Sequence, residues 1–578
     1  MIYDELLTSA GNLYDKGRLN EAEGILRQIL QVSPHNAPSL NLMGLIAQSQ
    51  NLHEQACIYF ADAIRYDDSK IEYRYNLAFS CRAMKRYEEA LYQFQKVIAE
   101  APQIKEAYNE IACIYKILGK QNEAVFWWQK ALQTSPDYAI ASVNLAYAQN
   151  DLTELENLSR QYPQEPLVWF DLAQINYEQN NLNTAKSDIN QALNIQPDDV
   201  ENNYLAGLIA LQSGDKTQAL TCFLKAERLD GTHFGAKLKL ADIYSLADNF
   251  TEAETRYKRL LELNKNDFDV HNNYAEMLYR NKRLSEALEE YRSAILINPQ
   301  SPETNNNLGT ILKDLGDYDE ALGLFFNALH YSPDMNDVSF NIVETLVLLA
   351  RNDKEKALKI AANWLKNYPD NIYAKQINYA LKGEKVAHNN SYTEKLFDAF
   401  ADNYELVMQN LDYSAPLALE QLKGSLQGII ADLGCGSGLA GQAVKSVQNK
   451  IIGVDISAKM LSLAEKKGIY EELVKSDIIE FLKTRYDYDW IMAIDVVNYL
   501  GNLSEFIRLC CGKKMLFTIE SDADIIDYRL DITSRYKHNP AYVEKLLQEN
   551  GFQDIKSQKT TLRLEAGQPV NGVLFLAK

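Results

Sequence analysis

A glycine-rich loop followed by a single carboxylate is the segment with the clearest capacity for chemistry. The loop Gly-Cys-Gly-Ser-Gly at 434–438 directly follows the apolar run 429–433, and Asp455 ends the next apolar run 21 residues after Gly434. Glycines let a backbone turn sharply and approach a ligand. A carboxylate at the end of the second strand can accept hydrogen bonds from both hydroxyls of a ribose. The pattern predicts a site for a nucleoside-containing cofactor.

The spacing of the loop glycines differs from that of a dinucleotide site. The dinucleotide fingerprint is Gly-x-Gly-x-x-Gly, whereas here the third glycine comes one residue early and Leu439 occupies the remaining slot. The first turn of the following helix has no basic residue, and Asp432 places a negative charge where a pyrophosphate would be repelled. A cationic sulfonium that carries an amino acid group suits this carboxylate better.

The elements that must position this loop are alternating strands and helices. Short apolar runs predict strands at 429–433, at 451–455, within 472–477, at 490–495 and at 514–520. Helices follow the first two runs, and Ser457 is placed to cap the second helix. The segment 560–578 reads as two strands around a Gly-Gln-Pro turn. Together they predict a parallel, doubly wound α/β sheet with one antiparallel strand inserted at its edge.

The sequence Asp-Leu-Gly-Cys-Gly-Ser-Gly at 432–438, followed by Asp455, resembles the first two motifs of class I S-adenosylmethionine-dependent methyltransferases. The resemblance implies a Rossmann-like seven-stranded sheet over 391–578 with S-adenosyl-L-methionine as cofactor. It implies a methionyl site at Asp432, Gly434, Cys435, Gly436, Ser437 and Gly438, a ribose site at Asp455, an adenine site at Ile456, Met460, Asp477 and Ile478, and Asp495 near the departing methyl group.

A period of 34 residues governs the segment 1–369. Small residues recur at this spacing from Ala10 to Ala146 and again from Ala173 to Gly309, with prolines and aromatic residues at fixed phases. One helix pair does not bury its own apolar face, so the period predicts helix–turn–helix units stacked into an α-solenoid. The segments 75–102 and 306–333 resemble tetratricopeptide repeats.

The 34-residue period is interrupted once, after Ala146, and it ends before residue 370. Between Ala146 and Ala173 the step is only 27 residues, which predicts an irregular repeat near 147–165 with a shortened second helix. The segment 370–390 then reads as a helical linker. Segments such as 392–405 and 536–552 resemble bacterial methyltransferases that carry these repeats before the catalytic domain. In that setting Tyr392, Phe397 and Tyr404 would form an aromatic lid over the cofactor, with plain core packing as the alternative.

Asparagines recur at one phase of the repeat. The five are Asn76, Asn144, Asn273, Asn307 and Asn341. In tetratricopeptide proteins this phase lies on the concave side, and an amide offers both a donor and an acceptor to a peptide backbone. The resemblance to the peptide-binding superhelix of O-GlcNAc transferases therefore implies a peptide groove. The alternative is that these amides are merely solvated.

The methyl acceptor is less defined by the sequence. The Asn-Pro-Pro-Tyr motif of adenine and glutamine amide methyltransferases is absent, since Asp-Val-Val-Asn occupies 495–498. His538 is a candidate general base, with a structural role as its alternative, and Tyr499 is a candidate for the acceptor pocket. No cluster of histidine with carboxylates marks a metal-dependent enzyme, so the sequence predicts no metal site.

Composition limits the partners of the chain. The formal net charge of −20 disfavours nucleic acid, since phosphate binding needs clustered Lys and Arg. No apolar run reaches the length of a spanning helix, which predicts no membrane segment. The start lacks the features of a secretion signal, and the seven scattered cysteines are typical of reduced thiols in a cytoplasmic protein.

These observations predict an S-adenosylmethionine-dependent methyltransferase whose superhelix recruits a protein or peptide substrate. An array of about 370 residues is larger than the binding of a small molecule requires. One alternative is a small-molecule or glycan-precursor methyltransferase that uses the array for docking or oligomerisation. A second alternative is a non-catalytic scaffold with a vestigial cofactor domain.

Overall fold

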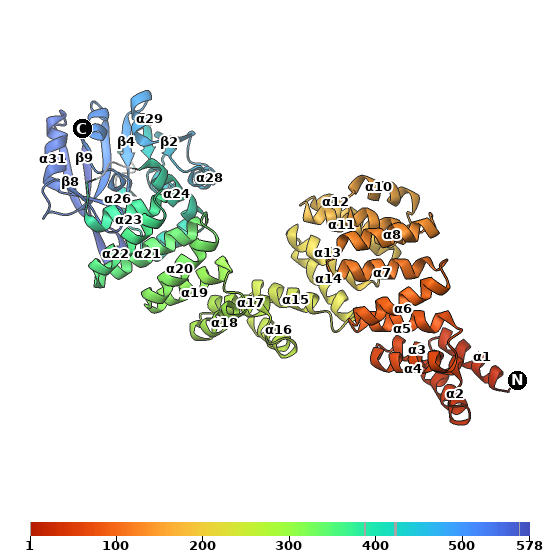
Figure 1. Cartoon of the computed structure of the whole chain (residues 1–578). Helices are drawn as coiled ribbons and strands as arrows, with labels where there is room; N and C mark the ends of the chain where they lie inside the picture. Colours follow the sequence, from red (N-terminus) through yellow and green to blue (C-terminus); the bar gives the residue numbers. More distant parts are fainter. Residues whose placement is uncertain (1, 386–388, 421–424, 566) are drawn as a thin grey trace. The chain divides into compact units, whose positions relative to one another are not determined.

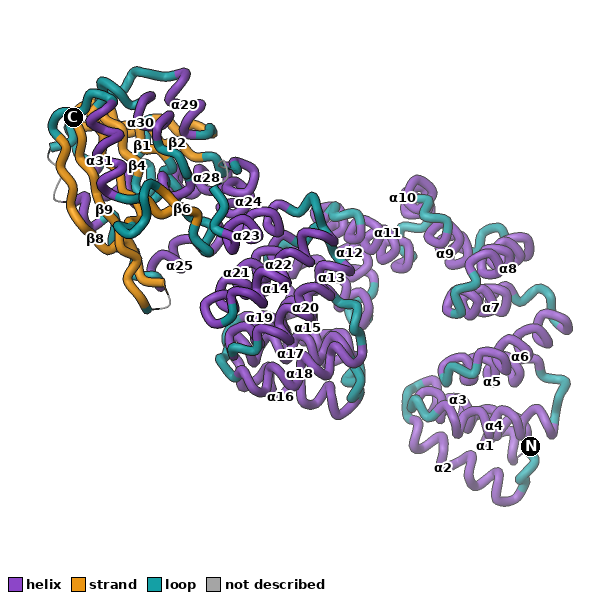
Figure 2. The backbone as a smooth tube through the Cα atoms, turned by 60° about the vertical axis from the view of Figure 1, so that its left-hand side comes forward, coloured by secondary structure: helices purple, strands orange, loops and turns teal. Residues whose placement is uncertain are grey.

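The computed structural model describes residues 2–385, 389–420, 425–565 and 567–578. It divides into two compact units, Met1–Leu263 and Asn264–Lys578. The first unit consists of helices joined by short turns, and the second contains further helices followed by an α/β domain (Figure 1, Figure 2). Within the described residues, no helix combines the length and the apolarity that a bilayer crossing requires.

The first unit is built from antiparallel helix pairs. Its helices are α1 Ile2–Asp15, α2 Leu19–Val32, α3 Ala37–Ser49, α4 His53–Tyr66, α5 Ile71–Ala83, α6 Tyr87–Glu100, α7 Lys105–Ile117, α8 Gln121–Thr134, α9 Ala139–Ala148, α10 Leu152–Gln161, α11 Pro166–Glu178, α12 Leu182–Ile195, α13 Val200–Gln212, α14 Lys216–Leu229, α15 Phe234–Leu246 and α16 Phe250–Leu263.

Packing inside each pair explains the ladder of small residues. A Cβ on Gly44 would lie 2.5 Å from the Phe60 ring, and a Cβ on Gly207 would lie 2.5 Å from the Phe223 ring. Both rings are fully buried. The small residue on the first helix therefore makes room for the aromatic residue on the second, which confirms the helix–turn–helix interpretation of the period.

The irregular repeat is shortened in both helices. Helices α9 and α10 have 10 residues each, whereas α7 and α8 of the preceding pair have 13 and 14. The sequence predicted a shortened second helix only. The missing residues are therefore shared between the two helices, and the pair still buries Val143, Leu155 and Leu158.

The second unit begins with the remaining solenoid helices. They are α17 Phe268–Arg280, α18 Leu284–Ile297, α19 Pro302–Leu315, α20 Tyr318–Tyr331, α21 Asn336–Asn352, α22 Lys354–Asn367 and α23 Ile372–Lys382. Helix α21 has 17 residues, three more than α19. Helix α23 lies in the predicted linker, and its buried residues include Tyr373, Ile377 and Leu381. The part of the predicted linker that α23 covers is thus a packed helix, and residues 386–388 lie outside the described residues.

The α/β domain that follows has one sheet. Its strands are β1 Gly428–Leu433, β2 Asn449–Asp455, β3 Glu472–Lys475, β4 Trp490–Ala493, β5 Lys514–Ser521, β6 Tyr528–Leu530, β7 Tyr536–His538, β8 Ile555–Glu565 and β9 Gln568–Ala577. Strands β3, β2, β1, β4 and β5 are parallel neighbours in this order. Strand β9 pairs antiparallel with both β5 and β8, as predicted for the closing hairpin.

Two short strands add to this seven-stranded arrangement. Strand β7 pairs with the end of β5 at Glu520 and Ser521, and β6 pairs antiparallel with β7. The sequence did not predict these three-residue strands. Leu530 on β6 and Tyr536 on β7 form a buried cluster with Ala380 of α23. These two strands therefore pack the sheet against α23, the last solenoid helix.

Helices cover both faces of the sheet and its carboxyl edge. They are α24 Asn390–Phe400, η1 Ala401–Asn403, α25 Tyr404–Asn410, α26 Leu417–Glu420, α27 Leu439–Val444, α28 Ala458–Lys466, α29 Ile478–Thr484, η2 Val497–Tyr499, α30 Ser504–Leu509 and α31 Pro540–Glu549. Two apolar cores result, one around Phe506, Phe517 and Phe575 and the other around Trp490 and Leu516. The sheet is thereby a rigid base for the loops at its edge.

Candidate functional site

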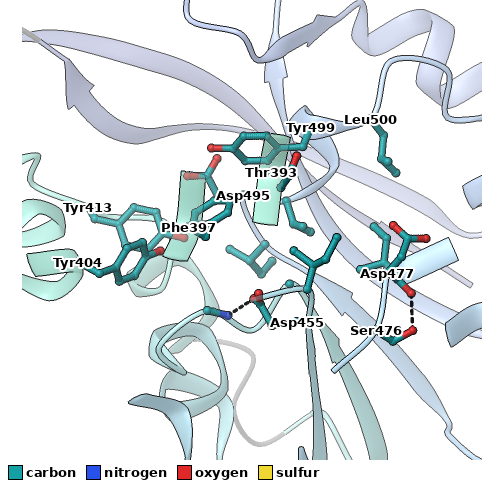
Figure 3. A pocket seen from close by; sticks show the side chains of 16 residues that line it. Thr393, Phe397, Tyr404, Tyr413, Asp455, Ser476, Asp477, Asp495, Tyr499 and Leu500 are labelled. Atoms are coloured by element: carbon teal, nitrogen blue, oxygen red, sulfur yellow. Dashed lines mark hydrogen bonds between the residues drawn. The ribbon is translucent and has the colours of Figure 1, made fainter. Parts of the chain in front are cut away.

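A cleft lies at the carboxyl ends of the parallel strands β1 to β4. It is lined by Thr393, Phe397, Tyr404, Tyr413, Gly434, Gly436, Asp455, Ile456, Ser476, Asp477, Ile478, Ile494, Asp495, Val496, Tyr499 and Leu500. The rings of Tyr404 and Tyr413 lie on one side, with Ser476 and Asp477 opposite and Asp455 between them (Figure 3). This is the edge at which open α/β sheets bind ligands.

The glycine loop has the backbone that the sequence predicted. Gly434, Gly436 and Gly438 all have positive φ, at 65°, 53° and 92°. A Cβ on Gly434 would lie 2.3 Å from Cγ2 of Val496. Only glycine fits there without strain, because the left-handed region and the close approach both exclude a side chain.

Asp455 holds the loop and faces the cleft. Its Oδ2 accepts a hydrogen bond of 2.9 Å from the backbone N–H of Gly436, and its Oδ1 accepts one of 2.9 Å from the N–H of Ser457. Burial raises the pKa of the Asp455 carboxyl, and these backbone donors oppose the rise. Each oxygen keeps a further lone pair, so the carboxylate can still accept from two hydroxyls of a ligand.

Two helix caps complete this side of the cleft. The Oγ of Ser457 accepts from the N–H of Met460 at 3.1 Å, which confirms the predicted cap of α28. The Oδ1 of Asp477 accepts from the N–H groups of Ile479 and Glu480 at 2.9 and 3.1 Å and caps α29. Its capping bonds leave Oδ2 with the capacity to accept a hydrogen bond from a base.

Asp495 is held by a buried ionic cluster. Nη1 of Arg563 donates to its Oδ1 and Oδ2 at 2.9 and 2.7 Å, and Nδ2 of Asn498 donates to Oδ1 at 2.9 Å. Arg563 also donates to Glu520 and to Glu565. Asp495 has a φ of 57°, a left-handed conformation that Asp adopts more readily than most other non-glycine residues. The cluster thus fixes this carboxylate at the cleft.

A second arginine shares this cluster. Nε of Arg535 donates to Glu520 at 2.7 Å, and the same arginine contacts Glu565. Burial of the Glu520 carboxyl would raise its pKa, but the charges of Arg535 and Arg563 outweigh that effect and lower the pKa to about 2. Three carboxylates therefore face two guanidinium groups, which leaves one negative charge in excess.

Aromatic residues of the segment 390–413, which we call the lid segment, narrow the cleft. Phe397 packs against Tyr499 with ring centroids 5.4 Å apart, and Tyr404 places its hydroxyl 3.6 Å from the Cβ position of Gly436. The enclosed volume is about 70 Å³, well below the roughly 300 Å³ at which small-molecule sites begin. A nucleoside cofactor fits the donors and acceptors of this cleft but requires these rings to move outward.

The third residue assigned to the lid lies elsewhere. Tyr392 does not line the cleft; its ring packs edge-on against Tyr373 of α23, with centroids 5.7 Å apart. It is 4% exposed. Tyr392 thus anchors α24 to the solenoid, while Phe397 and Tyr404 lie at the cleft.

Several other residues assigned to the cofactor point away from the cleft. Asp432 is buried behind the loop, where its Oδ2 accepts from the Tyr470 hydroxyl at 2.7 Å, and burial raises its pKa to about 7. Met460 is fully buried below the first turn of α28. Cys435, Ser437 and Gly438 belong to the loop but are absent from the described lining of the cleft. The backbone of the loop, rather than these side chains, is what a ligand would meet.

The candidate base His538 is not part of the site. It lies on β7 with no exposed surface, and its Nε2 donates to the carbonyl oxygen of Gly501 at 2.9 Å. Burial lowers its pKa to about 4. His538 is therefore a neutral structural residue, whereas Tyr499 does line the cleft.

The asparagines of the repeat connect neighbouring helices. Nδ2 of Asn76 donates to Asn41 at 3.0 Å, and Nδ2 of Asn341 donates to Asn306 at 2.9 Å. Asn144 bonds to Asn109 at 3.3 Å, and Asn307 forms a side-chain bond with Tyr291 of the preceding helix. Asn273 accepts a bond of 3.2 Å from its neighbour Asn272 within α17. All five predicted residues are partly exposed. Each amide thus forms at least one hydrogen bond within the solenoid, and the peptide-groove assignment remains a prediction.

Sequence reasoning missed Tyr413 of the lid segment and the pair Arg535 and Arg563. Arg563 lies 68 residues after Asp495 on β8. No local motif marks an arginine on a late strand as a partner of the fourth strand. The alternation of β8 gave no signal either, because the consecutive residues Leu562 and Arg563 are both buried at a register shift of the strand.

Comparisons with known proteins match two kinds of domain to different parts of the chain. Residues 430–511 match a methyltransferase domain, and residues 105–138, 167–199, 200–233, 238–302 and 290–323 match tetratricopeptide repeats. Protein FlbA of Caulobacter vibrioides is 25% identical over 127 residues, which are 22% of this chain and 21% of FlbA. Ubiquinone biosynthesis O-methyltransferase of Bordetella avium is 30% identical over 107 residues, which are 17% of this chain and 44% of that enzyme.

The chain thus spans less than half the length of these two curated relatives. A solved structure of the human IFIT1 dimer with m7Gppp-AAAA aligns with 59% of this chain and 89% of that chain, at 19% identity and a TM-score of 0.41. The expectation that this chain binds no nucleic acid stays a prediction.

Proposed function

We propose that this chain, a tetratricopeptide-repeat solenoid followed by a Rossmann-like methyltransferase domain, transfers a methyl group from S-adenosyl-L-methionine to a protein or peptide that the solenoid recruits. The single observation that carries the cofactor is the cleft at the carboxyl ends of β1 to β4. There Gly434 and Gly436 turn the backbone and Asp455 presents both carboxylate oxygens.

Different residues of the cleft are assigned to different parts of the cofactor. We assign Asp455 to the ribose hydroxyls and Asp477 with Ile478 to the adenine; the lining of the cleft by all three residues supports this assignment. When bound, the cofactor supplies a methyl group on a positively charged sulfur. Asp495, Tyr499 and Phe397 lie where that group would meet the acceptor, and the lid segment excludes water from it.

A protein substrate is supported by the solenoid itself. Tetratricopeptide repeats present an extended surface of stacked helices, a form suited to binding other chains. The concave asparagines are partly exposed and keep hydrogen-bonding capacity beyond the bonds described above.

Calorimetry with S-adenosyl-L-methionine tests the cofactor assignment. Asp455→Asn removes the charge of one acceptor of the ribose hydroxyls, and a hydrogen bond to a charged group is worth about 1.5–3 kcal/mol. We expect affinity to fall roughly 10- to 100-fold, while Asp524→Ala, at an exposed carboxylate outside the cleft, leaves it unchanged. A wild-type chain that gives no heat would contradict the proposal and favour a scaffold with a vestigial cofactor domain.

The substrate class is tested by incubating the protein with methyl-labelled S-adenosyl-L-methionine and a protein extract of the cells in which the protein naturally occurs. We expect label in protein, and label confined to small metabolites would contradict the protein-substrate proposal. Asp455→Asn is the matched control, since it should reduce incorporation in parallel with affinity.

A further inference from the structure

A second cavity adjoins the cofactor cleft inside the second unit. It encloses about 490 Å³ between helices α19 and α21 of the solenoid, the lid segment and the ends of the catalytic strands. Phe397, Tyr404, Asp495 and Tyr499 line both this cavity and the cleft. The two spaces therefore meet at the residues that surround the position of the transferred methyl group, and we call the larger one the junction cavity.

The solenoid wall of the junction cavity changes character between successive repeats. On α21 the wall combines Phe340, Val347 and Leu348 with the charged residues Glu344 and Arg351. The positions 34 residues before the three apolar ones are Asn306, Lys313 and Asp314 on α19, and Lys313 pairs with Glu344 at 2.6 Å. At these three positions the surface thus changes from polar on α19 to apolar on α21, where a peptide that follows it would reach the catalytic domain.

The opposite wall is the lid segment. Phe400 of α24 packs edge-on against Phe340 of α21, with centroids 4.9 Å apart, and Val407 and Met408 of α25 continue the apolar surface. A space with apolar side walls suits a long aliphatic stem.

The inner end has different chemistry. The cluster of Asp495, Glu520 and Glu565 with Arg535 and Arg563 leaves one carboxylate charge in excess. The rings of Tyr404 and Tyr499 stand beside it. Excess negative charge next to aromatic faces attracts a cation, both by direct charge interaction and through the ring quadrupoles.

We propose that the junction cavity is the acceptor channel, and that it takes a primary amine at the end of an aliphatic stem, the side chain of a lysine in a recruited protein. This inference rests on the proposed function. A polypeptide on the concave face of α19 would direct this side chain between α21 and the lid segment, with its amine toward Asp495 and Tyr499.

The transfer balances without a further reactant. The ammonium first loses one proton to water, a step that the apolar walls favour because burial penalises the charged form and that the carboxylates at the inner end oppose. The nitrogen lone pair then forms the N–C bond to the methyl carbon while the C–S bond breaks and its electron pair stays on sulfur. The products are a methylammonium group and the neutral thioether of the cofactor. The role of the channel is to align nitrogen, carbon and sulfur.

An amine-blocked protein extract tests the acceptor class. Full-length protein is incubated with methyl-labelled S-adenosyl-L-methionine and protein extract of the producing cells, and in parallel with the same extract after acetylation of its amines. We expect incorporation to fall at least 10-fold on acetylation and methyl-lysine to appear on mass spectrometry of the labelled protein. Label that survives acetylation, or that lies on oxygen, carbon or sulfur, overturns the lysine assignment.

Two substitutions on α21 test the channel. Val347 and Leu348 are half-buried and lie outside the lining of the cofactor cleft. Val347→Trp fills the cavity, and Leu348→Arg adds a positive charge that repels an ammonium. We expect each to reduce transfer at least 10-fold with cofactor affinity unchanged, while Leu296→Trp, at a residue of α18 that is 86% exposed, has no effect.

The outcomes separate this inference from the proposed function. Absence of cofactor binding by the wild-type chain defeats the proposed function, and so does label that enters only small molecules. Cofactor binding and protein labelling that persist at the wild-type rate in both α21 variants defeat the channel alone. Retained cofactor affinity in the variants shows that the catalytic domain has folded.

Discussion

Arg563 is the residue on which the ionic cluster at the cleft depends most. Its side chain is 4% exposed and contacts three carboxylates, those of Asp495, Glu520 and Glu565. Arg563→Met keeps an unbranched side chain of similar length but removes the charge. Three carboxylates are then left with Arg535 as the one remaining cation of the cluster, and Arg535 contacts only Glu520 and Glu565.

The expected cost follows from the burial of the partners. Removing one member of a buried ion pair costs about 3–5 kcal/mol, because the other charge loses its compensation. Asp495 keeps the amide of Asn498 as a donor, so the lower part of that range applies. We expect Arg563→Met to destabilise the catalytic sheet by about 3 kcal/mol near pH 8.

The pH dependence of that cost distinguishes ionic compensation from lost packing. Arg563 is one of the two arginines whose charges lower the folded pKa of the Glu520 carboxyl to about 2, so Arg563→Met moves that pKa back toward the unfolded value of about 4. The stability that the lowered pKa contributes is present above about pH 4 and is lost as pH falls toward 2. The difference between variant and wild type should therefore be larger at pH 8 than at pH 3.

Hydrogen exchange of the β5 and β9 amides is the suitable assay, because it reports opening of this sheet without assuming that the whole repeat protein unfolds in one step. Arg529→Met is the matched control, since Arg529 is half-exposed and pairs with Asp522 at 2.8 Å; we expect a change below about 1 kcal/mol. A cost for Arg563→Met that is equally small, or one that does not change with pH, would refute the reasoning.

Three further perturbations have defined outcomes. Gly434→Ala should abolish measurable cofactor binding in calorimetry, because its Cβ would lie 2.3 Å from Val496 at a φ of 65°, whereas Gly512→Ala, at a φ of 80° with open space around it, should affect only stability. Glu520→Gln should destabilise the protein by about 3 kcal/mol at pH 7; because the folded pKa is lowered to about 2, that difference should shrink in urea titrations as pH falls from about 5. Asp432→Asn should gain stability relative to wild type as pH rises from 4, with the gain levelling off above pH 7, because burial raises the folded pKa to about 7; a constant difference would contradict this.

Features of the fold that repeat were predictable from the sequence. The contact of Gly44 with Phe60 recurs in Gly207 with Phe223 and in Gly309 with Phe325. Since the same packing constraint acts in each pair, it leaves a period in the sequence. The three-residue strands β6 and β7 have no such signal, because they are too short for an alternating pattern.

The candidate site was predictable where a local backbone motif defines it. The positive φ of Gly434 and Gly436 and the position of Asp455 follow from strand, turn and strand in sequence order. The direction of a side chain does not follow from such a motif. Asp432 points to Tyr470 and Tyr392 points to Tyr373 of α23. Both contacts join residues that are distant in the sequence, so a local motif does not predict them.

The position of the unit boundary bears on how the solenoid can be separated from the catalytic domain. Phe340 contacts Phe400, Lys385 pairs with Asp527 at 2.6 Å, and Ala380 packs with Tyr536. Helices α21 and α23 are thereby walls and supports of the catalytic domain as well as parts of the solenoid. A deletion of 1–369 would remove α21 and with it one side of the junction cavity, so loss of activity would not distinguish recruitment from damage to the site. The boundary between Leu263 and Asn264 leaves these contacts intact, so a deletion that ends there separates the contribution of the distant repeats from that of the acceptor channel.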